Sequence, residues 1–86
     1  MDDNAKAYIQ QHATVATLEM ALAKLIADNL RDEPNPKQAC SEWFAPIQRT
    51  HLRYLEQPSD TLDRVMSQAY VDASTSLREL TDAMLD

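Results

Sequence analysis

The residue types that could hold a metal ion or do catalysis in this chain are Cys40, His51, His12, Glu19 and Glu42. They include the thiolate, imidazole and carboxylate ligands that zinc accepts in proteins. Cys40 and His51 lie eleven residues apart in a segment with helical periodicity, which separates their backbones by about 16 Å. One ion cannot span that distance, so we expect no metal site and interpret Cys40 as a small core residue.

Catalysis by these side chains is also disfavoured. The thiol of Cys40 and the imidazole of His51 are about three helical turns apart, too far for direct activation of a nucleophile. The carboxylates of Asp60 and Asp63 are explained by the start of a helix. Glycine is absent from all 86 residues, which excludes glycine-rich phosphate loops and the nucleophile elbow. We therefore expect no catalytic residue, no cofactor and no enzymatic activity.

The elements that position these side chains are predicted to be helices. Apolar residues recur at helical spacing in three segments, about residues 4–31, 36–56 and 59–84, with proline-containing turns between them. No segment alternates as a strand would. The sequence predicts one domain with an all-α fold, an antiparallel three-helix bundle with short turns. Pro46 cannot donate a hydrogen bond to the carbonyl of Glu42, so we expect the second helix to be kinked there.

Side chains that favour helix N-termini precede each segment. The candidates are Asp2, Asp3 or Asn4 for the first helix, Asn35 with Pro36 and Gln38 for the second, and Ser59 or Asp60 for the third. The turns are predicted at Asp32-Glu33-Pro34-Asn35-Pro36 and at Gln57-Pro58-Ser59-Asp60.

The first predicted helix is apolar on two adjoining faces. One face, which we name the stripe, carries large side chains: Tyr8, Val15, Leu18, Leu22, Leu25 and Ile26. The other, which we name the shoulder, is the predicted interface: Ile9, His12, Ala13, Ala16, Glu19, Met20, Ala23 and Ala27. His12 and Glu19 either make a polar contact that fixes register with another helix or subunit, or lie at the wet edge of this face. The helix is about 42 Å long, and the second helix is too short to cover both faces. We therefore expect a two-fold dimer formed through the shoulder.

The third predicted helix also has an apolar line with strict four-three spacing, which we name the seam. Its members are Leu62, Met66, Ala69, Ala73, Ser76, Leu80 and Ala83. Because the middle of the seam is small, a neighbouring helix should approach closely there, opposite a bulky residue such as Leu22 or Trp43.

The net charge of −6 disfavours nucleic acid as a partner because phosphates would be repelled. Acidic residues on the third helix could instead form a rim that attracts a basic protein: Asp63, Asp72, Glu79 and Asp82. A single cysteine favours a reducing compartment, and the acidic N-terminus and short apolar runs give no sign of a signal peptide or membrane span. We expect a cytoplasmic protein.

These features together predict a non-enzymatic helical protein–protein interaction module, an adaptor, inhibitor or assembly factor that associates with itself through its first helix. The alternative is a dimeric DNA-associated regulator that would use Lys37, Arg49 and Arg53.

Overall fold

Three helices form the structure, a computed structural model in which residues 2–56 and 60–85 are described. They are α1 (Asp3–Leu30), α2 (Pro36–Glu56) and α3 (Thr61–Ala83). The described residues include no strand, so the all-α fold is confirmed. Each described helix begins and ends within two residues of the predicted bounds. Gln57, Pro58 and Ser59, where we predict the second turn and one candidate cap, lie outside the described residues.

The N-terminus of each helix is capped by a side chain that the sequence singles out. Asp2, Asn35 and Asp60 each accept a hydrogen bond from the backbone N–H three residues later, at 2.7, 3.3 and 2.7 Å respectively. Such bonds satisfy one of the N–H groups that the first turn of a helix leaves without a partner. Gln38 meets Asn35 through their side-chain amides at 3.3 Å.

Pro46 lies inside α2 and does not end it. The helix runs from Pro36 to Glu56 as one element, although the proline has no N–H to donate. One turn later, the Thr50 hydroxyl donates to the carbonyl of Pro46 at 3.0 Å. The kink at this position stays a prediction.

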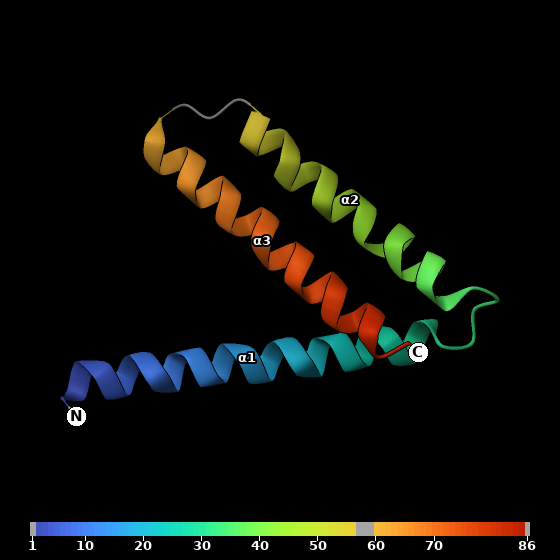
Figure 1. Cartoon of the computed structure of the whole chain (residues 1–86), viewed down its shortest axis with the longest axis horizontal. Helices are drawn as coiled ribbons and strands as arrows, with labels where there is room; N and C mark the ends of the chain where they lie inside the picture. Colours follow the sequence, from blue (N-terminus) through green and yellow to red (C-terminus); the bar gives the residue numbers. More distant parts are fainter. Residues whose placement is uncertain (1, 57–59, 86) are drawn as a thin grey trace.

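The molecule is flat, with dimensions of 48 × 37 × 14 Å. α2 and α3 lie side by side and antiparallel, while α1 contacts them near its C-terminal end (Figure 1). Every pair of helices is in contact, but α1 and α3 diverge towards their N-termini (Figure 1). The N-terminal half of α1 therefore extends away from the other two helices.

The core is small and partly polar. The buried residues among those described are Ala23, Ala27, Cys40, Phe44, Ser67, Ser74 and Thr81. The three hydroxyl residues recur every seventh position along α3, which places them on one line of that helix. The Ser74 hydroxyl lies 3.3 Å from Nδ1 of His51 on α2, so this line faces α2.

The hydroxyl groups of Ser74 and Thr81 can be buried because carbonyl groups of the same helix accept hydrogen bonds from them. The Ser74 hydroxyl donates to the carbonyl of Val71 at 3.0 Å, and the Thr81 hydroxyl donates to that of Leu77 at 2.7 Å. Backbone partners of this kind remove the penalty of an unsatisfied polar group. Small hydroxyl side chains thus let α2 approach α3 closely.

The seam does not lie on this line, and its predicted packing against another helix is wrong at its N-terminal end. At its middle the seam lies beside α1, because the Ser76 hydroxyl donates a hydrogen bond to Glu19 at 2.8 Å. Ala73 borders the same space as Leu22. Leu62, Met66, Ala69 and Ala73 are exposed, and only the end near Leu80 is partly buried. The physical reason is that α2 packs against the smaller hydroxyl residues instead.

Cys40 is fully buried in α2, as predicted for a core residue. Burial raises the pKa of its thiol, and the negative charge of Asp82 raises it further. A thiol that is both protonated and inaccessible is a poor nucleophile. We expect Ellman's reagent at pH 8 to modify Cys40 slowly in the native protein and completely in 6 M guanidinium. Rapid modification of the native protein would show that Cys40 is accessible.

Candidate functional site

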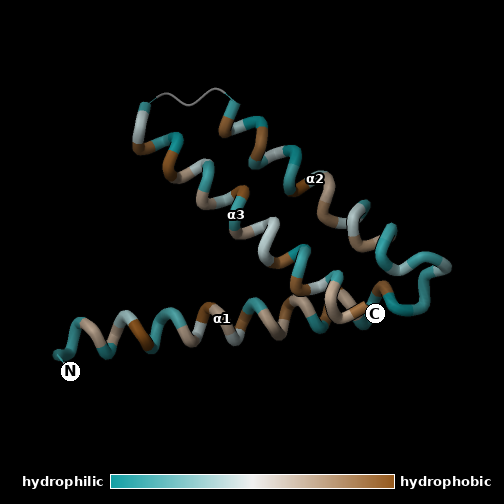
Figure 2. The backbone as a smooth tube through the Cα atoms, in the orientation of Figure 1, coloured by the Kyte–Doolittle hydropathy of each residue, from teal (hydrophilic) through white to brown (hydrophobic). Residues whose placement is uncertain are grey.

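The stripe on α1 is an exposed apolar surface in the described chain. Tyr8, Val15, Leu18, Leu22 and Leu25 are all at least half exposed, and only Ile26 is partly covered. Hydrophobic residues occur along the whole of α1, including the half that extends away from α2 and α3 (Figure 2). The side chains that would be expected to form the core of α1 therefore face solvent in a single chain.

The shoulder on α1 divides into a covered and an uncovered part. Ala23 and Ala27 are fully buried, so their assignment to a dimer interface is wrong. They lie four residues apart, on the face of α1 that also carries Glu19. This face is directed towards α3. The chain itself covers this face, and alanine is small enough to allow the close contact.

Glu19 makes a polar contact with another helix of the same chain, and this contact lies at the exposed edge of the face, so a role in fixing register stays a prediction. Its Oε1 accepts a hydrogen bond from the Ser76 hydroxyl of α3 at 2.8 Å. His12, the other polar residue of this face, is exposed and stacks on Tyr8 with 6.3 Å between ring centroids.

The other predicted interface residues are exposed on α1. They are Ile9, Ala13, Ala16 and Met20. Their role in self-association stays a prediction.

A hollow of about 240 Å³ lies where α1 and α3 begin to diverge. It is lined by Val15, Leu18, Glu19, Leu22, Ala73 and Leu77. Leu22 of the stripe and Ala73 of the seam thus border the same space, from two helices. Its lining is apolar apart from Glu19, whose carboxylate is already held by Ser76. This hollow joins the stripe and the seam into one surface.

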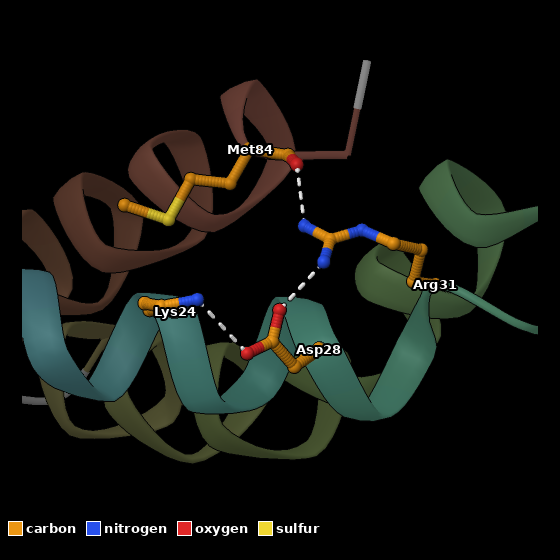
Figure 3. Close-up of polar contacts among 4 residues, drawn as sticks. All are labelled: Lys24, Asp28, Arg31 and Met84. Atoms are coloured by element: carbon orange, nitrogen blue, oxygen red, sulfur yellow. Dashed lines mark hydrogen bonds and ion pairs between the residues drawn. The ribbon is translucent and has the colours of Figure 1, made fainter.

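Charged groups hold the C-terminal ends of α1 and α3 together. Arg31 donates one hydrogen bond to Asp28 at 2.6 Å and another to the carbonyl of Met84 at 3.2 Å (Figure 3). Lys24 also pairs with Asp28, at 3.1 Å. The hydrogen bond from Lys24, together with the bond and charge of Arg31, lowers the pKa of the Asp28 carboxyl. Arg31 places a cation at the negative end of the α3 dipole.

The acidic rim predicted on α3 stays a prediction, and its members have different surroundings. The Asp82 carboxylate pairs with Lys37 of α2 at 3.1 Å, so it is occupied within the chain. Asp63 lies at the opposite end of α3 from Asp82. Asp72 and Glu79 are exposed, and Asp72 accepts a hydrogen bond from Gln68 at 2.9 Å. The four carboxylates therefore do not form one continuous acidic edge.

The basic residues considered for DNA binding are also divided. Lys37 is engaged by Asp82, whereas Arg49 and Arg53 are exposed on α2. A positive patch built on all three residues is therefore weakened at Lys37.

Within the described ranges, no group of three or more His, Cys, Asp or Glu residues could hold a metal ion. None of the described helices is long and apolar enough to cross a lipid bilayer. Comparisons with protein-family models, with curated proteins and with solved structures gave no match.

Proposed function

We propose that this chain is a non-enzymatic protein–protein interaction module that associates with itself through α1 and serves as an adaptor, inhibitor or assembly factor. The observation that carries the proposal is the accessible surface, which is 6574 Å². A compact folded monomer of 9.8 kDa exposes about 5,200 Å². The single chain therefore exposes about 1,400 Å² more than a protein of its mass does when compact.

Large hydrophobic side chains contribute to this exposed surface. Fifteen large hydrophobic side chains are exposed among the described residues, and the stripe on α1 gathers five of them on one line. Apolar surface of this extent is typical of interaction sites, because covering it with another protein removes it from water. The radius of gyration, 15.7 Å, likewise exceeds the value of about 12 Å for a compact chain of this length.

Sedimentation equilibrium between 1 and 100 µM protein tests the proposal. We expect a mass of about twice the 9.8 kDa of one chain, and a thermal midpoint that rises with protein concentration because dissociation accompanies unfolding. A mass of 9.8 kDa throughout this range would contradict self-association.

A further inference from the structure

We infer that the surface used for self-association is the stripe on α1 together with the exposed part of the seam on α3, and that a second copy of this chain covers it with the same surface. This inference rests on the proposed self-association and names the face responsible. It differs from the interface that the sequence predicts, which is the shoulder.

The spacing of the stripe suits packing against another helix. Tyr8, Val15 and Leu22 recur every seventh residue, and Leu18 and Leu25 lie three residues after two of them. These are the a and d positions of a heptad, which insert between the side chains of a facing helix. No glycine or proline interrupts α1, so the line extends over about 26 Å.

The shoulder is a poorer candidate for the interface. Its C-terminal part, Ala23 and Ala27, is already covered within the chain. Of its exposed members, Ala13 and Ala16 have only a methyl group each, and they would remove little apolar area from water on association. The stripe, by contrast, consists of large side chains, five of which are at least half exposed.

Charge also favours the stripe and the seam. Each chain has a net charge of −6, so two copies repel, and a contact surface without carboxylates avoids adding to that repulsion at close range. The stripe contains no charged residue, and neither does the seam. Glu19 is the one acidic residue that lines the hollow between them, and the Ser76 hydroxyl donates a hydrogen bond to its Oε1.

The amount of excess accessible surface is consistent with a dimer of identical chains. In a two-fold dimer the same patch is buried on both copies. Removing the excess of about 1,400 Å² from each copy would bury about 2,800 Å² in total, which lies in the range of obligate homodimers, 2,000–5,000 Å². Two copies therefore suffice to bring each chain to the surface of a compact protein.

A matched pair of substitutions tests which face is used. Leu18 and Met20 are equally exposed, at 58% and 57%, and they point about 160° apart around α1. Leu18→Lys and Met20→Lys add the same charge, one on the stripe and one on the shoulder. Sedimentation equilibrium with circular dichroism should give a folded Leu18→Lys protein at half the mass of the parent and a Met20→Lys protein at the parent mass.

The possible results separate the inference from the proposed function. A parent chain of 9.8 kDa would refute self-association itself. A dimeric parent whose Leu18→Lys variant remains dimeric would refute only the stripe as the interface. Dissociation by Met20→Lys alone, or by both variants equally, would do the same.

Cysteine cross-linking covers the case in which Leu18→Lys does not fold. Val15→Cys, Leu18→Cys and Leu25→Cys would be made singly in a Cys40→Ala background, with Met20→Cys as the control. A cysteine near a two-fold axis oxidises to a disulfide with its own copy, because the two Cα atoms come within about 7 Å. We expect a covalent dimer from at least one stripe position and none from Met20→Cys. Failure at all three stripe positions would overturn the inference.

Discussion

Replacing Phe44 with alanine is expected to lower the free energy of unfolding by about 3–5 kcal/mol, the usual cost of removing a fully buried phenylalanine. Phe44 is the largest fully buried side chain described, with 1% of its surface exposed. Its ring meets that of Trp43 edge to face, with 4.9 Å between centroids. With so few buried apolar residues, α2 has little else to replace this contact. Guanidinium unfolding followed by circular dichroism at 222 nm would measure the loss.

Leu52→Ala is the control for this prediction. Leu52 lies on the same helix but is exposed, so its truncation should change the free energy of unfolding by less than about 1 kcal/mol. Equal losses from Phe44→Ala and Leu52→Ala would show that Phe44 is not the anchor of α2.

Introducing a carboxylate at Ala27 is expected to destabilise the contact of α1 with the rest of the chain by about 3 kcal/mol or more. Ala27 is fully buried, and an aspartate there would add both volume and a charge removed from water. The same substitution at the exposed Ala13 keeps the helix, the residue types and the added charge constant. Guanidinium unfolding of Ala27→Asp and Ala13→Asp compares the two sites.

If Ala13→Asp were as destabilising as Ala27→Asp, charge on α1 rather than burial would explain the loss. A nearly unchanged Ala27→Asp protein would instead show that this face of α1 can separate from the chain without a large effect on stability.

Local signals in the sequence were sufficient to locate the helices. Asp2, Asn35 and Asp60 mark three helix starts, and each caps the helix that it precedes. Capping and the restrictions that proline places on the backbone act over a few residues, so they can be recognised without knowledge of the fold. The bounds of α1, α2 and α3 could therefore be predicted to within two residues.

The face that each helix turns inward could not be predicted in the same way. Apolar size pointed to Leu18 and Leu22 as core on α1, whereas the chain buries Ala23 and Ala27. A helical wheel identifies the faces that avoid water, but it does not say which molecule covers them. Which face is buried within the chain depends on how all the helices pack together. A face with small residues can be the buried one because it permits a closer approach of the helices.

The candidate site was found only in part for the same reason. The stripe was visible in the sequence but was expected to be covered within the chain. On α3, the buried residues Ser74 and Thr81 belong to none of the apolar lines that the sequence shows, and their hydroxyl groups need hydrogen-bond partners. Those partners are carbonyl groups one turn earlier in the same helix, a possibility that a count of apolar residues leaves out.

In the part of α1 that extends away from the other helices, the exchange rate of the amide protons should depend on whether the chain has associated with another copy. Isolated helical segments of fewer than about 12–15 residues are marginal in water, so the first turns of α1 should fray and exchange quickly with deuterium in a lone copy. The turns around Ala23 and Ala27 are anchored and should exchange more slowly. Slow deuterium exchange of the amide protons near Tyr8 would therefore show that another molecule covers the N-terminal end of α1.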